Sequence, residues 1–367
     1  MSSPKANYLP SLDGLRAIAV MIVFVSHAGW GSVVPGGFGV TIFFFLSGYL
    51  ITSLMRVEYE RTATLSLKHF YLRRVYRILP PMYLVLFLLL GLWAIGVLDG
   101  PVRWPAVAAQ ILQSTNYYIL YGDSSALVPF TGTFWSLAVE EHFYMVFPLL
   151  FLFCVRRWSY GRVALILLAL CIVELAWRAV LVQGGAVPDR TYMASDTRLD
   201  NMLFGCIMGL WMNPSRDQPP AVFNTLPVQL GVMAVALAVL AASFIVRDPF
   251  FRETWRYTLQ GAALFPLFWL AVRHPEWPLF RPLNWRLVRL MGNISYVFYL
   301  CHFFWLHLFA QQLPGRPYLA VALGWIASVL FSIVVYQLVE QPFARLRRRL
   351  HDEVKPAKAG VGVGGLA

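Results

Sequence analysis

The chain has 367 residues, of which 59% are hydrophobic and only 13% are charged. Soluble domains carry about 25% charged residues, so this composition excludes an ordinary water-soluble protein and indicates a membrane protein. The net charge of +12 comes from 30 Lys and Arg residues against 18 Asp and Glu residues. The basic residues lie in short loops between apolar runs, which is typical of membrane proteins and argues against nucleic acid as a partner.

Eight apolar runs are long enough to cross a bilayer, which takes about 20 helical residues. They cover residues 13–31, 36–55, 79–98, 133–154, 161–182, 226–246, 291–311 and 317–340. Two shorter runs, at 199–213 and 257–272, complete ten spans if both cross the membrane. The run at 103–120 is interrupted by polar residues, and we expect it to be interfacial or re-entrant.

Four basic regions determine the predicted orientation, because Lys and Arg gather on the cytoplasmic side of membrane proteins. These regions are residues 56–77, 156–162, 273–289 and 345–349. All four face the cytoplasm in a bundle of ten helices. The loop that carries Arg247, Arg252 and Arg256 is the exception, since it falls outside in this scheme. We therefore predict an all-α polytopic protein of the inner (cytoplasmic) membrane, with about ten transmembrane helices and both termini cytoplasmic.

The same pattern predicts one membrane-embedded domain over residues 1–345, followed by a basic, disordered cytoplasmic tail over residues 346–367. The four cysteines all lie inside apolar runs and show no CxxC spacing. We therefore expect no disulfide and no metal site.

Ionisable residues inside a span are costly, and they indicate function unless a partner satisfies them. Arg16 and His27 lie on the first predicted span, eleven positions apart. Three helical turns separate them, so they share a face and differ in depth by about 16 Å. The structural alternative is an arginine that reaches back to the inner surface and an interfacial histidine satisfied by a neighbour.

The fourth predicted span begins with the segment FWSLAVEEHFY, which contains Glu140, Glu141 and His142. Counted from the outer ends of their helices, Glu140 and His27 lie at similar depths and could meet. A histidine with a carboxylate partner is the usual arrangement of a general base. The alternative is a structural pair that joins two helices.

Three further sites are less specific. For Asp196, in the segment SDTRLDNMLFG, we expect a loop position, while Arg198 and Asp200 form either an ion pair that lines a cavity or simple interfacial polar groups. His302, in the middle of a span and among aromatic residues, is typical of a core histidine with a satisfied ring.

The segment LSLKHFYLRRVYRILPPMY reads as a basic amphipathic helix at the cytoplasmic end of the third predicted span. It either anchors the chain on anionic lipid or binds a cytosolic phosphate. Arg74 and Arg77 are three positions apart, so their planar guanidinium groups could converge on one anion.

Together these motifs resemble the membrane-bound acyltransferase 3 family. The resemblance rests on the spacing of Arg16 and His27, GFGVTIFFFLSGYLI, the Arg74-x-x-Arg77 pair, FWSLAVEEHFY, the D-x-R-x-D of 196–200 and SYVFYLCHF, and it covers residues 9–342. It implies an enzyme that transfers acyl groups, usually acetyl, from cytosolic acyl-CoA to sugar hydroxyls of glycans or antibiotics.

The resemblance also assigns roles to residues. It implies that Arg16 and His27 are the family's essential pair and that Arg74 and Arg77 are its cytoplasmic arginine pair. It also implies that Glu140 is the carboxylate of the family's WSL-x-x-E motif. Two features differ from the commoner pattern: His142 replaces a Gln, and SYVFYLCHF replaces SYPLYLWHW. These differences leave the donor chemistry intact and leave the acceptor open.

We therefore predict a membrane O-acyltransferase in which Arg74 and Arg77 bind acyl-CoA and His27 deprotonates the acceptor hydroxyl. Arg16 guides the donor and Glu140 orients His27. Supporting positions on the acceptor side are Glu141, Arg198, Asp200 and His302. The expected partners are the lipid bilayer, acetyl-CoA or another acyl-CoA as donor, and a carbohydrate-containing acceptor. The alternative is a proton-coupled secondary transporter that uses the same intramembrane His, Glu and Arg residues. Acyl chain length, direct transfer or an acyl-enzyme, and oligomeric state stay open.

Overall fold

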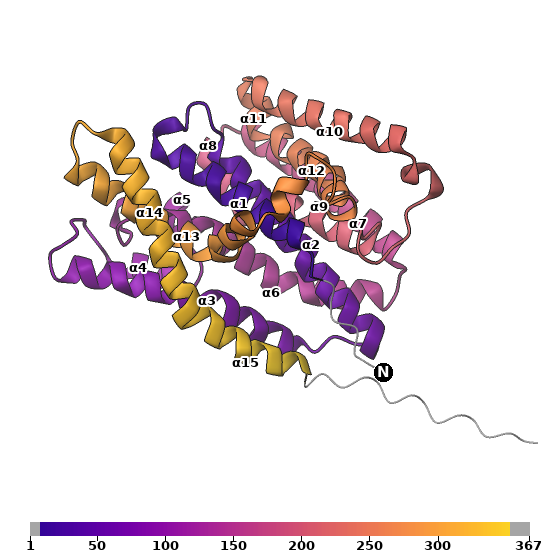
Figure 1. Cartoon of the computed structure of the whole chain (residues 1–367), viewed down its shortest axis with the longest axis horizontal. Helices are drawn as coiled ribbons and strands as arrows, with labels where there is room; N and C mark the ends of the chain where they lie inside the picture. The colour runs from indigo at the N-terminus through magenta and orange to yellow at the C-terminus, as the bar shows by residue number, and fades with distance from the viewer. Residues whose placement is uncertain (1–7, 353–367) are drawn as a thin grey trace, which may run out of the picture.

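The computed structural model of the chain describes residues 8–352, with side chains described as far as residue 347. Helices and loops make up this part of the chain, and it contains no strand (Figure 1). The all-α polytopic fold is therefore confirmed.

Eight described helices are long and apolar enough to cross a membrane, and they coincide with the eight predicted long spans. They are α1 (Pro10–Val25, continued by the π-helical turn η1 at Ser26–Trp30), α2 (Gly36–Thr62), α3 (Leu67–Ala94), α6 (Trp135–Val155), α7 (Tyr160–Gln183), α10 (Leu226–Ile245), α13 (Arg286–Gln312) and α14 (Pro317–Val335). A turn at Tyr336–Glu340 joins α14 to α15 (Gln341–Asp352).

The two shorter apolar runs also form helices. The first, α9 (Leu199–Leu210), has 12 residues, so it is shorter than a full span and lies buried inside the bundle. The second, α12 (Trp255–Arg273), has 19 residues. The ten predicted helices are therefore present, and eight of them have both the length and the hydropathy of a span. The cytoplasmic location of both termini stays a prediction.

The interrupted run at 103–120 folds as two short helices, α4 (Trp104–Ile111) and α5 (Thr115–Tyr121). Neither is long enough to cross a bilayer, in agreement with the expected interfacial or re-entrant segment. Short helices α8 (Pro188–Met193) and α11 (Pro249–Glu253) lie in two other connections.

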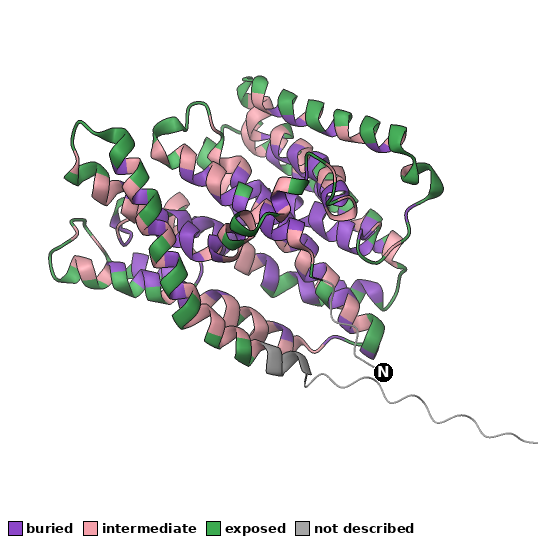
Figure 2. Ribbon diagram, viewed as in Figure 1, coloured by how far each residue is buried: buried purple, intermediate pink, exposed green. Residues whose placement is uncertain are grey.

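Buried residues gather on the inner helices, whereas α10 and much of α7 and α14 carry exposed residues (Figure 2). On α7 the exposed residues are large and apolar: Leu165, Ile172 and Val173 are each more than 60% exposed. An apolar surface of this kind is stable in lipid rather than in water.

Helices α2 and α9 pack at very short range because a glycine of each helix faces the backbone of the other. A Cβ atom on Gly48 would lie 1.9 Å from the carbonyl oxygen of Met202, and one on Gly205 would lie 2.1 Å from that of Phe45. Small residues allow such close backbone contact in membranes. This contact fixes α9 beside the helix that lines the site described below.

Helices α1 and α13 run parallel in contact along their length. Near their N-terminal ends, a Cβ atom on Gly292 would lie 1.9 Å from the carbonyl oxygen of Asp13. At the C-terminal end of the first span, the ring of His27 lies 5.1 Å from that of His302, which is in the middle of α13. The two histidines meet because these helices are neighbours, although 275 positions separate them in sequence.

The C-terminal helix α15 packs against α3, with the rings of Tyr76 and Phe343 5.9 Å apart. The helix continues to Asp352, so the expected boundary between domain and tail at residues 345 and 346 falls inside it. Residues 353–367, which form most of the predicted tail, lie outside the described residues.

Candidate active site

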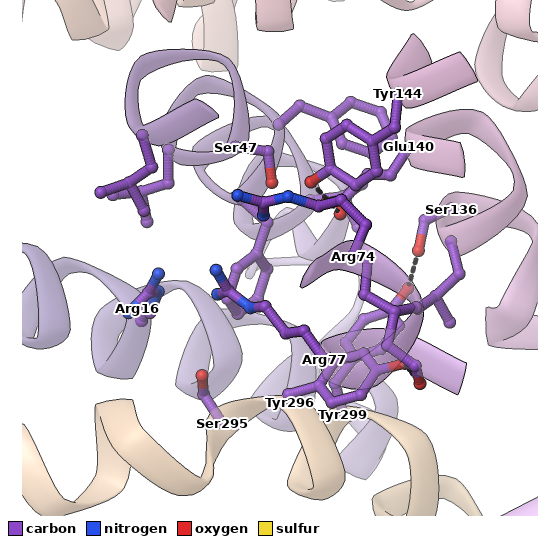
Figure 3. Close-up of a pocket in the computed structure, with 17 residues that line it drawn as sticks. Arg16, Ser47, Arg74, Arg77, Ser136, Glu140, Tyr144, Ser295, Tyr296 and Tyr299 are labelled. Atoms are coloured by element: carbon purple, nitrogen blue, oxygen red, sulfur yellow. Dashed lines mark hydrogen bonds between the residues drawn. The ribbon is translucent and has the colours of Figure 1, made fainter. Parts of the chain in front are cut away.

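Four of the predicted site residues line one cavity in the centre of the bundle. Arg16 comes from α1, Arg74 and Arg77 come from α3, and Glu140 comes from α6 (Figure 3). The cavity is narrow, with a volume of about 90 Å³. The rest of its wall includes aromatic and hydroxyl side chains: Phe43, Phe44, Ser47, Ser136, Tyr144, Ser295, Tyr296 and Tyr299.

The charged groups in this cavity have few partners. Tyr144 donates a hydrogen bond from its hydroxyl to Glu140 Oε2 at 3.0 Å. The guanidinium of Arg74 lies 5.5 Å from the centre of the Tyr144 ring, and its Nε has no hydrogen-bond partner among the described residues. Arg16 donates from Nη1 to Asp13 Oδ1 at 2.9 Å. One carboxylate therefore faces two arginines of α3 across the cavity.

His27 lies in a different cavity, at the C-terminal end of α1, and its hydrogen-bond partner is His302. The expected pairing of Glu140 with His27 is therefore wrong. Thr133, in the turn before α6, and Trp135, the first residue of α6, line the cavity that contains His27. Glu140 lies five residues beyond Trp135, about 8 Å further along α6, and faces the central cavity instead.

The two histidines form a directed chain of hydrogen bonds. Nδ1 of His27 lies 2.8 Å from Nε2 of His302, and Nδ1 of His302 lies 2.8 Å from the carbonyl oxygen of Tyr299. A carbonyl oxygen only accepts, so we assign the proton of neutral His302 to Nδ1. His302 Nε2 then accepts from Nδ1–H of His27, which leaves Nε2 of His27 with a free lone pair.

The surroundings of the two rings differ. His302 is fully buried, whereas His27 is exposed on the π-helical turn that ends the first span. Single π-turns inside helices occur frequently at functional sites. The sequence prediction of a satisfied core histidine holds for the burial of His302, but it missed the second histidine as its partner.

Three cavities follow one another through the bundle. The outer cavity, about 410 Å³, contains His27 and shares Val40 and Tyr299 with the central cavity. The inner cavity, about 430 Å³, shares Arg16 and Arg77 with the central cavity. Its other lining residues are Tyr76, Asn293, Tyr336, Glu340, Gln341, Ala344 and Arg347.

Arg198 and Asp200 are both fully buried, so neither is an interfacial group. They also do not pair with each other. Asp200 Oδ2 accepts from Nη2 of Arg178 at 2.6 Å, and Arg178 Nη1 lies 3.3 Å from Glu174 Oε1. Arg198 precedes the first residue of α9 and has a non-helical backbone, whereas Asp200 lies in the first turn of the helix, and the two side chains face different neighbours. Both alternatives for this pair are therefore wrong, and the ion pair of Asp200 is with Arg178 instead.

Arg198 lies among rings instead of carboxylates. Its guanidinium lies 4.3 Å from the centre of the Tyr257 ring and 5.3 Å from that of Tyr192. Nη2 donates to Thr41 Oγ1 at 3.1 Å, while Nε and Nη1 have no partner within residues 8–352. Cation–π contacts of this kind stabilise a cation without neutralising it.

Asp196, Glu141 and His142 lie outside the three cavities. Asp196 lies in the expected loop, where burial raises its pKa but hydrogen bonds from Arg190 and Trp177 outweigh that effect, so that the pKa is lowered. Glu141 is half-buried, and its Oε1 has no hydrogen-bond partner in the described part of the chain. His142 pairs through Nδ1 with Ser195 Oγ at 2.7 Å.

Sequence reasoning missed Arg178 and Glu174. Both lie inside the apolar run at 161–182, so the rule that intramembrane ionisable residues need a partner would have identified them. Tyr144 carried no such signal, because a tyrosine in an apolar span is common.

Comparison with known proteins identifies the family of the chain. Residues 9–337 match the family Acyl_transf_3, described as an acyltransferase domain. The match covers most of the chain, and the chain therefore belongs to this family, as its motifs predicted.

Two relatives are similar over most of the chain. The peptidoglycan O-acetyltransferase OatA of Listeria monocytogenes serovar 1/2a is 31% identical over 311 residues, 81% of this chain and 49% of the relative. The O-acetyltransferase OatA of Staphylococcus aureus strain NCTC 8325 is 32% identical over 367 residues, 94% of this chain and 58% of the relative. The chain spans about half the length of the curated relatives it matches. No solved structure matches the chain significantly.

Proposed function

We propose that this protein is an O-acyltransferase of the cytoplasmic membrane that moves an acyl group, most simply acetyl, from cytosolic acyl-CoA to a hydroxyl of a carbohydrate-containing acceptor on the other side. The observation that carries the proposal is the series of three cavities. Arginines line the inner end of the series, and the His27–His302 pair lies at the outer end. The family and the names of its relatives support the reaction type.

The inner cavity suits the phosphates of coenzyme A. Arg16 and Arg77 line both this cavity and the central one, and Arg347 lines the inner cavity from the C-terminal helical segment. Guanidinium groups bind phosphate oxygens in pairs of charge-assisted hydrogen bonds. Arg74 lies one helical turn before Arg77 on α3, and it lines the central cavity but not the inner one.

The central cavity is too narrow for the whole donor. Its volume of about 90 Å³ is well below the roughly 300 Å³ of the smallest drug-sized pockets. A slender acyl-pantetheine arm fits this shape better than a nucleotide, so the arm enters the bundle while the nucleotide stays in the inner cavity. The thioester then approaches the outer cavity.

The chemistry needs one base and one leaving thiolate. Nε2 of His27 takes the proton of the acceptor hydroxyl as its oxygen bonds to the thioester carbonyl carbon. The carbon–sulfur bond breaks, and the coenzyme A thiolate leaves and is protonated. Nδ1–H of His27 remains hydrogen-bonded to His302, which holds the base in the required tautomer and orientation.

Glu140 has a different role from the one its sequence suggested. It lies with Arg16, Arg74 and Arg77 rather than with His27, so its charge and its hydrogen bond from Tyr144 hold the arginine cluster in place. An unbalanced group of arginines inside a bundle is costly, and one carboxylate reduces that cost.

The comparisons do not support the sequence alternative, a proton-coupled transporter, because the chain matches an acyltransferase family and O-acetyltransferase relatives. One result separates the two functions. A transferase releases free coenzyme A thiol from acetyl-CoA when a hydroxyl acceptor is present, whereas a transporter moves solute with a proton gradient and cleaves no thioester.

The test uses the purified full chain in phosphatidylcholine nanodiscs with acetyl-CoA and soluble peptidoglycan fragments, which the relatives' names suggest. Thiol release that depends on both the fragments and His27 supports the proposal. Acetylated fragments, detected by mass spectrometry, identify the product. The absence of thiol release with fragments and with a panel of simple glycosides, together with proton-dependent uptake, would favour the transporter.

A further inference from the structure

A second pocket lies beside the outer cavity, and three arginines line it. Its volume is about 280 Å³, and Arg247, Arg252 and Arg256 come from the loop and helices that follow α10. The opposite wall comes from the loop after the first span, from the start of α2 and from α8; it includes Gly37 and Phe38 of α2 and Tyr192 of α8. This pocket contains the basic loop that the positive-inside rule places on the wrong side of the membrane, so topology does not explain its charge.

These arginines have little to neutralise them. The side chains of Arg247 and Arg252 form no hydrogen bond or ion pair within residues 8–352. Arg256 lies 3.9 Å from Glu253 Oε1 and donates to the hydroxyl of Tyr257 at 3.0 Å, while its Nε is buried without a partner.

The nearby carboxylates already have other partners. Asp248 Oδ1 accepts from the backbone N–H of Phe251, and Glu253 Oε2 accepts from Thr191 Oγ1 at 2.6 Å. Behind the pocket, the buried cation of Arg198 lies against the rings of Tyr257 and Tyr192, which both line it. The pocket therefore has a net positive charge and room for an anion.

The pocket adjoins the cavity that contains His27. Gly37 and Tyr192 line both. A Cβ atom on Gly37 would lie 3.0 Å from the Tyr192 hydroxyl oxygen, so a larger residue at this shared wall would displace the ring. A ligand that reaches across the shared wall places one end at the arginines and the other at His27.

We propose that this pocket, with Arg247, Arg252 and Arg256 as its ligands, binds an oxyanion carried by the acceptor, a phosphate or a carboxylate. The inference rests on the proposed function and deepens it: the acceptor is an anionic glycan or a phosphate-linked sugar rather than a neutral one. Bidentate guanidinium groups hold the anion and position the acceptor hydroxyl at His27. A phospholipid head group has the same chemistry, and the experiment separates these sources.

The first measurement is the binding of inorganic pyrophosphate to the purified full chain in phosphatidylcholine nanodiscs. The double variant Arg247→Gln with Arg252→Gln should bind pyrophosphate at least about tenfold more weakly, since two charge-assisted contacts are lost. Arg316→Gln, an exposed arginine in the loop before α14 that lines none of these cavities, is the matched control and should bind as the wild type does. Arg77→Ala shows whether pyrophosphate binds instead at the inner arginines.

Equal pyrophosphate binding by the double variant and the wild type overturns the proposal. A loss of binding in Arg77→Ala alone overturns it as well, because the anion then occupies the inner end. If adding phosphatidylglycerol to the nanodiscs abolishes pyrophosphate binding by the wild type, the pocket holds lipid and the acceptor assignment is wrong.

The second measurement is thiol release with peptidoglycan fragments. The double variant should raise the KM for the fragments with little change in kcat or in acetyl-CoA affinity, and an unchanged KM contradicts an acceptor role. If the wild type releases no thiol at all, the proposed function fails, while the pyrophosphate measurement still decides whether the pocket binds anions.

Discussion

Nδ1 of His27 and Nε2 of His302 lie 2.8 Å apart, joining the end of the first long helix to the middle of α13. A carbonyl oxygen at the far side of His302 sets the direction of this hydrogen bond and leaves Nε2 of His27 free to accept a proton. This arrangement resembles the histidine and its orienting carboxylate in a catalytic triad, with a buried neutral imidazole in place of the carboxylate.

Removing the base should abolish most of the transfer. General-base assistance typically contributes about a hundredfold to ten-thousandfold, so His27→Ala should lower kcat by that order. Acetyl-CoA binding should survive, because the inner arginines belong to a separate cavity. Near-normal transfer by a folded His27→Ala variant, measured as thiol release, would show that another group is the base.

His302 should act as a positioning residue. His302→Phe keeps a planar aromatic ring but removes the acceptor for Nδ1–H of His27, and turnover should fall on the order of ten- to a hundredfold, the range typical of losing the partner that orients a metal-bound histidine. His302→Gln retains an acceptor oxygen and should recover part of this loss. If the role of His302 is purely structural, the loss of turnover in each variant should follow its loss of thermal stability. Turnover and melting temperature are therefore measured together for both variants.

The inner arginines should control the donor affinity. Arg77→Ala removes a residue that lines two of the three cavities, and the dissociation constant for acetyl-CoA should rise about tenfold or more, since a hydrogen bond to a charged group contributes roughly 1.5–3 kcal/mol. Arg162→Ala, an exposed arginine at the start of α7, is the control and should bind normally. Isothermal titration decides the question, and equal affinities would assign Arg77 to lipid anchoring.

The contact between α2 and α9 should tolerate no side chain at Gly48. A Cβ atom there would lie 1.9 Å from a backbone oxygen of α9, which cannot move aside as a flexible side chain can. Gly48→Leu should therefore cost at least about 1–3 kcal/mol and lower the melting temperature. Gly91→Leu is a matched control, because a Cβ atom on Gly91 meets nothing within 4 Å. Similar melting curves for the two variants would contradict the close packing.

The predicted orientation can be tested on intact cells. The four native cysteines are buried, so Lys68→Cys and Asp189→Cys should each introduce one accessible thiol. A membrane-impermeant maleimide should label Asp189→Cys from outside and label Lys68→Cys only after permeabilisation. The reverse pattern would invert the topology and exchange the donor and acceptor ends of the cavity series.

The sequence by itself was sufficient for the helices and for most of the residues of the candidate site. Hydrophobic runs of about 20 residues identify spans because a bilayer must be crossed by a continuous helix with its backbone hydrogen bonds satisfied. Ionisable residues inside such runs stand out for the same reason, and they identified Arg16, His27, Glu140 and His302. The criterion also applies to Arg178, which was overlooked.

Only the tertiary structure decided which of these residues meet. Depth along a helix can be estimated from spacing, but the rotation of each helix and the identity of its neighbours depend on packing between segments far apart in sequence. Glycine contacts place α1 against α13, so His27 faces His302, while Glu140 turns toward the arginines of α3. The same packing pairs Asp200 with Arg178 and places Arg198 against tyrosine rings. Side-chain partners depend on the surfaces that helices present to each other rather than on their order in the chain.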